Sequence, residues 1–305
     1  SGDASLLESW GTKSDGTGSS PSSFDYKAQN FNLNRDAVIS NNWNFGGKIT
    51  LNGKLDLGNY DITLLKDSEL AGSFSSSNMI VTSGTGVVKK IFTSDGQFTF
   101  PIGDNTVTAE YSPVTIDIAA TSYAADAYVS AKVVNQKHPN NTSITNFINR
   151  YWSLTSSGIT DFLYDIEMQY TDADLNSGTD ENSLYLGKYS GGSWTLLNKA
   201  TAPSNTLSGT TLDSFSDFTG GESAALPVEL TSFTAKYLSS GVVLNWQTAT
   251  EINNNKFEVE RQINDGNWEV VGEVLGHGNS NTVIDYTYTD SKTSTKGKYN
   301  YRLKQ

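Results

Sequence analysis

The feature that most limits the fold of this chain is the alternation of its apolar and polar residues, with almost no helical spacing. Few segments carry apolar residues at positions i, i+3, i+4 and i+7 over the length of a helix. Alternating segments recur throughout, and turn residues interrupt them about every 8–12 positions, a spacing typical of all-β proteins. Because 305 residues form two or three domains of ordinary size, the sequence predicts an all-β chain of serial β domains.

The first predicted region, residues 1–103, is irregular or solenoid-like. It opens with a Gly- and Ser-rich stretch, residues 11–23, that we expect to be loop. Short alternating runs separated by glycine or asparagine follow, and such short strands fit the stacked coils of a β-helix. Their spacing is irregular, so an open sandwich is the alternative. The expected strands are residues 48–51, 54–57, 61–65, 79–82 and 87–92.

The second predicted region, residues 104–223, has the pattern of a β-sandwich. Residues 111–118, 127–133 and 162–170 alternate cleanly, which predicts strands with one buried face. Residues 183–189 and 193–197 flank Gly191 and Gly192, and a glycine turn between two such runs predicts a hairpin. Six or seven strands of this kind make an adhesin-like sandwich.

The third predicted region, residues 224–305, has the spacing of a fibronectin type III-like sandwich. Pro227 marks a short linker, and Trp246 is expected to point inward from a strand. The pair Asp265-Gly266 predicts a hairpin turn. Tyr299 or Tyr301 is expected at a tyrosine corner. The pattern predicts a sandwich that lacks its last strand, as in a cut or proteolysed fragment.

The order of short sequence motifs in this third region resembles that of a known family. Leu226-Pro227-Val228-Glu229-Leu230 is followed by Leu244-Asn245-Trp246-Gln247-Thr248-Ala249 and then by Tyr299-Asn300-Tyr301-Arg302-Leu303. The order resembles the fibronectin type III-like module near the C-terminus of Bacteroidetes secreted surface proteins, which commonly precedes a type IX secretion sorting domain. Segments such as Phe98-Thr99-Phe100-Pro101 and Arg150-Tyr151-Trp152 resemble adhesin-like proteins of the same group. The resemblance implies export, a location at the outer cell surface of a Gram-negative bacterium or in the medium, and an adhesive or scaffolding role.

Composition excludes several classes of function. The chain has no cysteine, so thiol nucleophiles, thiolate zinc sites and disulfides are absent. A net charge of −12 argues against nucleic acid and anionic lipid as partners. The chain contains no run of about 18 apolar residues, so the sequence predicts no membrane-spanning helix.

One loop has the composition of a calcium site. Asp172, Asp174, Asn176 and Asp180 place oxygen donors at nearly alternate positions around a turn, which suits Ca²⁺. The pattern departs from an EF-hand because its glycine falls one place late and Ser183 stands at the twelfth position. The simpler interpretation is a solvated loop. We expect no catalytic residue and no cofactor other than this calcium ion.

The sequence gives little indication of a catalytic site. His138 and His277 are the only histidines and lie in different regions, so structural roles are expected for both: a polar loop and a bend. No nucleophile elbow or phosphate loop appears. The carboxylates Asp56, Asp61, Asp67 and Glu69 lie in the solenoid-like region, where a carbohydrate-active enzyme would place its acids, but turn residues beside glycine and asparagine are more often solvated.

The resulting hypothesis is a non-enzymatic adhesion or scaffolding protein that binds a glycan or a surface protein. Exposed Trp and Tyr rings stack on sugars, and Trp10 and Trp43 are freer to be exposed than Trp152, Trp194, Trp246 and Trp268, which lie on expected strands. The alternatives are a carbohydrate-active enzyme that uses the first region and a passive spacer of a larger secreted protein.

Overall fold

The structure is a computed structural model that describes residues 2–13, 15–141, 147–222, 230–249, 251–264, 266–280, 282–293 and 297–304. The predicted all-β class is confirmed: the elements of the described residues are strands and short 3₁₀ helices. Two compact units form the chain, Ser1–Ser190 with Leu197–Ala225, and Gly191–Leu196 with Leu226–Gln305. The predicted linker around Pro227 lies outside the described residues. The 3₁₀ helices are η1 (Leu7–Ser9), η2 (Asp172–Asp174), η3 (Glu181–Ser183) and η4 (Ala202–Ser204).

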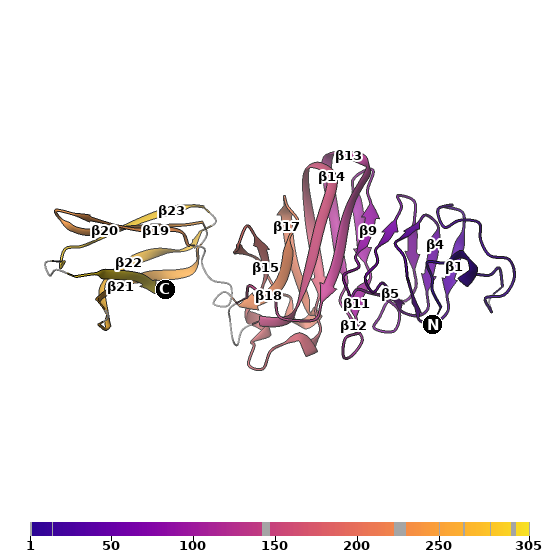
Figure 1. The fold of residues 1–305 in the computed structure, drawn as a ribbon, viewed down its shortest axis with the longest axis horizontal. Coiled ribbons are helices and arrows are strands. Elements are labelled where there is room, and N and C mark those ends of the chain that lie inside the picture. Colours follow the sequence, from indigo (N-terminus) through magenta and orange to yellow (C-terminus); the bar gives the residue numbers. More distant parts are fainter. Residues whose placement is uncertain are drawn as a thin grey trace. The chain divides into compact units, whose positions relative to one another are not determined.

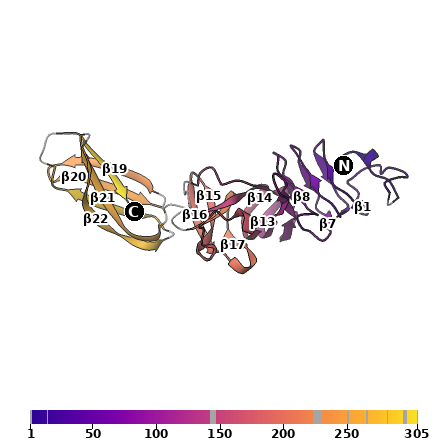
Figure 2. The same cartoon turned by 90° about the horizontal axis from the view of Figure 1, so that it is seen from below.

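The N-terminal unit begins as a β-solenoid of three coils (Figures 1 and 2). Each coil contributes one short strand to each of three faces, and equivalent strands of successive coils pair in parallel. The solenoid prediction is therefore confirmed. The first coil holds β1 (Asn30–Leu33), β2 (Ala37–Val38) and β3 (Trp43–Phe45); the second β4 (Lys48–Leu51), β5 (Leu55–Asp56) and β6 (Ile62–Leu64); the third β7 (Glu69–Ala71), β8 (Ile80–Val81) and β9 (Val88–Ile91).

Alternation along each strand explains how the coils close. In β1 the side chains of Phe31 and Leu33 are buried while those of Asn30 and Asn32 are exposed, because successive residues of a strand point to opposite faces. Ile49 and Leu51 of β4 stack on them in register. Ion pairs tie neighbouring coils together outside this core, such as Lys48 with Glu69 at 3.1 Å.

Lys90 is a buried cation inside the solenoid wall. Its ammonium Nζ donates to the backbone carbonyls of Leu65 at 2.8 Å and Lys66 at 3.0 Å, and reaches Ser68 O at 3.4 Å. Burial lowers the pKa of Lys90 to about 8. The lysine therefore fixes the turn between β6 and β7 through its hydrogen bonds.

Lys90→Met should lower the free energy of unfolding by about 1–3 kcal/mol at pH 7, because the turn carbonyls lose their donor. The folded-state pKa of about 8 lies below the unfolded value of 10.5, so the unfolded chain binds more protons between them. Wild-type stability should therefore gain a Lys90 contribution as pH rises from about 8 to 10.5. Urea unfolding across this range measures it; an equal pH dependence in Lys90→Met would contradict the assignment to Lys90.

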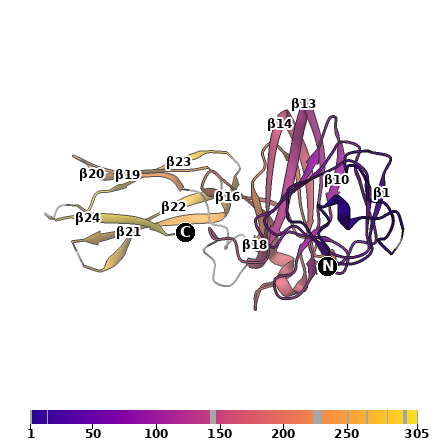
Figure 3. The same cartoon turned by 45° about the vertical axis from the view of Figure 1, so that its right-hand side comes forward.

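A long bent hairpin continues the solenoid into the second part of the unit (Figures 1 and 3). Its strands are β13 (Val114–Val134) and β14 (Phe147–Gln169), paired antiparallel with a register shift between Tyr123 and Tyr128. On either side of this shift β13 pairs with a different strand, β10 on one side and β9 on the other. The remaining strands are β10 (Gly96–Phe100), β11 (Ile102–Asp104), β12 (Glu110–Tyr111), β15 (Leu184–Ser190), β16 (Ser193–Lys199), β17 (Thr206–Leu212) and β18 (Asp217–Glu222).

Residues 1–103 and 104–223, which the sequence divides into two regions, share one core. A single cluster of buried side chains runs from Ala4 to Phe218. One sheet likewise runs from β3 of the first coil to β16 through β13 and β14. The solenoid thus passes into the sandwich without a break at residue 103. The expected glycine hairpin at Gly191 and Gly192 is present, since β15 and β16 are neighbours and both glycines have positive φ.

The C-terminal unit is a β-sandwich of two three-stranded sheets. Its two sheets have the order β19-β20-β23 and β22-β21-β24, which Figures 1 and 3 show as two layers. The predicted hairpin between β21 and β22 is confirmed by their pairing, although Asp265 itself lies outside the described residues. The strands are β19 (Leu230–Leu238), β20 (Gly241–Thr248), β21 (Glu251–Ile263), β22 (Trp268–Ser280), β23 (Ile284–Asp290) and β24 (Tyr299–Lys304).

Aromatic rings fill the core of this sandwich. Trp246 is buried, as predicted, and stacks on Tyr286 with ring centroids 5.4 Å apart. The ring of Phe257 packs edge-on against that of Trp246. The hydroxyl of Tyr301 donates to the carboxylate of Asp290 at 2.8 Å rather than to the backbone acceptor of a tyrosine corner. Trp268 is only half-buried, and the guanidinium of Arg302 lies over its ring at 4.3 Å.

Candidate functional site

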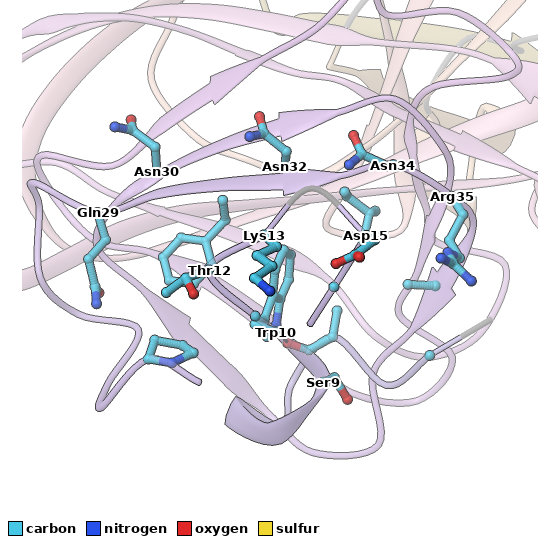
Figure 4. Close-up of a pocket in the computed structure, with 18 of the residues that line it drawn as sticks. Ser9, Trp10, Thr12, Lys13, Asp15, Gln29, Asn30, Asn32, Asn34 and Arg35 are labelled. Carbon is cyan, nitrogen blue, oxygen red and sulfur yellow. Dashed lines mark hydrogen bonds between the residues drawn. The ribbon is translucent and has the colours of Figure 1, made fainter. Parts of the chain in front are cut away.

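A groove lies at the N-terminal end of the solenoid (Figure 4). It has a volume of about 810 Å³. One wall is the consecutive run Gln29 to Arg35, which contains β1, and the other comes from the segment between Ser9 and Pro21. We call it the N-terminal groove. Because every residue of the first wall contributes, the groove follows the backbone of β1 along its length.

The position of β1 leaves one of its edges open. β1 is the outermost strand of the sheet β1-β4-β7. The N–H of Lys48 donates to the carbonyl of Gln29, and the N–H of Asn52 donates to that of Leu33. Alternate residues of a strand turn their N–H and C=O to the same side, so Asn30 and Asn32 face away from β4. Within the part of the chain that the structure describes, no backbone group pairs with theirs.

The segment before β1 caps the rest of the first coil. Asp3 forms a bridge to Val38, which covers the edge of β2. The indole N–H of Trp10 donates to the carbonyl of Ala4 at 2.9 Å, and its ring lies edge-on to Phe31 at 5.0 Å. The segment therefore holds its shape by packing on the aromatic residues of the coil, and it leaves the groove beside β1.

The expectation that Trp10 and Trp43 are the exposed tryptophans is wrong for Trp43, which is 2% exposed. Trp10 is half-buried and packs against Phe24, Phe31 and Trp43. Glycine and asparagine neighbours suggested exposure, but in a solenoid these residues form the tight corners beside a buried ring. Trp152, Trp194 and Trp246 are buried as predicted.

Charged side chains of both signs line the groove. Lys13 and Arg35 are exposed, and neither forms an ion pair with any described residue. Asp3 and Asp15 also line it, but their carboxylates already accept hydrogen bonds, from Ser5 and from Thr17 at 2.9 Å or less. Burial opposes ionisation of Asp3, but hydrogen bonds lower the pKa values of both aspartates and so favour their charged form. These side chains therefore give the groove two positive and two negative charges, and only the two cations have no hydrogen-bond or ion-pair partner among the described residues.

The four predicted calcium ligands have separate partners. Asp174 is buried and accepts from the guanidinium of Arg150 at 2.7 Å, while Asp172 accepts from the amide of Asn205. Asp180 caps η3 by accepting from the N–H of Asn182 at 3.0 Å. Asn176 donates its N–H to the carbonyl of Phe147. No group of three or more acidic or histidine side chains among the described residues is arranged to hold a metal ion, and calcium binding stays a prediction.

The carboxylates of the solenoid lie on different faces. Asp56 is in β5 and accepts the N–H of Gly58, and Asp61 precedes β6 and pairs with Lys89 at 2.7 Å. Glu69 is in β7 and pairs with Lys48. Strands β5, β6 and β7 belong to three different sheets. These acids therefore serve turns and contacts between coils, and their positions give no support to paired general acid and base roles.

The structure contains a buried charge cluster that the sequence does not predict. Arg150 of β14 is fully buried and donates to Asp104 of β11 at 2.8 Å, to Asp174 of η2 at 2.7 Å, and to Glu110 of β12. Burial raises the pKa of Glu110, and the neighbouring Asp174 and Asp104 add to this against the opposing effect of Arg150. Arg150 is at least 24 residues away from each of its three partners in sequence, and no spacing marks them as partners.

Both histidines are held in hydrogen-bond networks. His138 lies in a loop, as predicted, but its side chain is buried: its Nδ1 accepts the N–H of Asn140, and its Nε2 lies 3.2 Å from Asp217. His277 lies within β22, not at a bend, and its Nδ1 is 2.8 Å from the hydroxyl of Tyr286. That hydroxyl gives its one proton to Glu251, so Nδ1 of His277 is the donor. Both side chains thus have partners within the fold, and the structural roles expected of them stay a prediction.

Comparison with protein-family models, with curated proteins and with solved structures finds no match for this chain. The family resemblance inferred from the order of sequence motifs in the third region therefore stays a prediction. Among the described residues, no helix has the length and apolar character needed to cross a membrane.

Proposed function

We propose that the protein is a non-enzymatic adhesion or scaffolding module of a secreted or cell-surface protein, and that it binds its ligand in the N-terminal groove. The observation that carries this proposal is the groove itself: about 810 Å³ of space beside an unpaired strand edge and unpaired cations. The amide and hydroxyl groups that line it suit binding, whereas the solenoid carboxylates are engaged in turns and ion pairs. The outer-surface location follows from the sequence resemblance alone.

Binding of the whole chain to a glycan array and to a peptide array tests this proposal. Asn30→Trp places an indole at the groove wall and should abolish the binding seen with wild type. Asn105→Trp is the matched control, because Asn105 is also an exposed asparagine of the same unit but does not line the groove. Absence of binding on both arrays, or equal binding by Asn30→Trp, would reject the groove as the ligand site.

A further inference from the structure

We infer that the N-terminal groove binds an extended peptide segment, which adds to β1 as a further strand of the sheet β1-β4-β7. This inference rests on the proposed function, because it names the class of ligand for the same groove. Strand addition is an established mode of peptide recognition in which main-chain hydrogen bonds give affinity and alternate side chains give specificity.

The first support is the set of free backbone groups. The N–H and C=O of Asn30 and Asn32 face away from β4 and have no described partner. Unpaired edge groups invite pairing with another chain, and proteins usually cover them. Here the capping segment covers the edge of β2 through Asp3 and leaves that of β1 open. An extended peptide offers donors and acceptors with the spacing that these four groups require.

The second support is the shape of the groove. The wall from Gln29 to Arg35 is a continuous stretch of chain, and an extended partner of equal length spans about 23 Å at 3.3 Å per residue. Figure 4 shows Asn30, Asn32 and Asn34 in one row along the strand, pointing the same way. An added strand would continue this pattern, with polar side chains beside the asparagine row and apolar ones on the side of Phe31 and Leu33.

The third support is charge. Lys13 and Arg35 line the groove without an ion pair among the described residues, whereas Asp3 and Asp15 are hydrogen-bonded. A single carboxylate placed beside Lys13 or Arg35 complements that cation, whereas Asp3 and Asp15 would repel further acidic groups. The net charge of −12 disfavours a densely acidic ligand, so one or two carboxylates in an otherwise uncharged segment fit best.

A saccharide is the less favoured ligand. Sugar binding commonly uses an exposed aromatic face, and the tryptophan at this groove is half-buried against Phe24, Phe31 and Trp43. A sugar would also leave the regular array of backbone donors and acceptors along β1 incompletely paired. The peptide explains both the open edge and the length of the groove.

The test uses the whole chain and a library of peptides of about eight residues, with valine at alternate positions and serine, asparagine or glutamate between them. Asn32→Pro removes the outward N–H but keeps the pairing of β1 with β4, because proline is tolerated where the N–H of an edge strand faces solvent. Asn32→Ala is the matched control that removes the side chain and keeps the N–H. We expect Asn32→Pro to bind about tenfold more weakly and Asn32→Ala to bind like wild type.

A second probe does not depend on the folding of a variant. A library peptide that binds the wild-type protein is N-methylated at alternate residues, so that these residues cannot donate backbone hydrogen bonds. Its affinity for the wild-type protein should fall by tenfold or more. Equal binding of this peptide, or of Asn32→Pro with an unchanged melting curve, overturns strand addition. Binding to a glycan but to no peptide overturns the inference and leaves the proposed function intact. Concentration-dependent self-association that Asn32→Pro abolishes would instead identify a second copy as the occupant.

Discussion

Arg150→Met is expected to destabilise the N-terminal unit more than any other single substitution of a charged residue, by about 3–5 kcal/mol at pH 7. Methionine keeps much of the side-chain volume but removes the cation that Asp104, Glu110 and Asp174 share in a fully buried position. Removal of one partner from a buried ion pair leaves uncompensated charge, and here three carboxylates would remain. Urea unfolding of wild type and variant measures the difference.

The pH dependence of this effect has a definite sign. The pKa of Glu110 is raised in the folded state, so the folded chain holds that proton more tightly than the unfolded chain. Its favourable contribution is present below the ordinary value of 4.5 and is lost as pH rises through the raised folded pKa. Loss of Arg150 should strengthen this trend, so the destabilisation by Arg150→Met should shrink as pH falls toward 4.5.

Arg302→Met is the control, because Arg302 pairs with Glu260 while half exposed and should cost no more than about 1 kcal/mol. A similar small effect for Arg150→Met, independent of pH, would show that the buried cluster does not hold β11, β12 and η2 against β14.

Trp246→Ala is expected to unfold the C-terminal unit, with a loss of about 3–5 kcal/mol. Trp246 is 1% exposed and contacts both Phe257 and Tyr286 in a core that, among the described residues, holds six buried apolar side chains. A core this small cannot repack around the cavity. Because the two units have separate cores, the unfolding transition of the N-terminal unit should keep its midpoint.

Trp268→Ala gives the matched comparison, since Trp268 is half-buried beneath Arg302 and should cost about 1 kcal/mol. Calorimetry of the whole chain separates the transitions. One cooperative transition that shifts as a whole in Trp246→Ala would contradict the division into two independently stabilised units.

The positions of many strands were predictable from the sequence because they depend on the local alternation of apolar and polar residues. Runs such as residues 48–51 carry their inward residues, Ile49 and Leu51, at every second position, and that period survives in the structure as β4. The hairpins at Gly191 and between β21 and β22 were predictable for the same local reason. The continuous core across residue 103 was not, because it depends on which strands meet, and β13 joins β9 and β10 over long sequence distances.

The groove and the charge cluster were not predictable for a related reason. Burial of Trp43 and the open edge of β1 both follow from the position of the first coil at the end of the solenoid, which local composition does not encode. Likewise the loop from Asp172 to Asp180 has the composition of a calcium site, yet Asp174 is engaged by Arg150, a residue from another strand. Side-chain partners separated by many residues come only from the fold.

Hydrogen–deuterium exchange with residue resolution, with and without bound peptide, tests the central claim most directly. In the free protein the N–H groups of Asn30 and Asn32 should exchange quickly, while that of Phe31, which faces β4, is protected. Saturating peptide should slow exchange at Asn30 and Asn32 and leave Phe31 nearly unchanged. Protection of Asn30 and Asn32 in the free protein, or no change at these two positions when peptide is bound, would contradict an open β1 edge as the binding site.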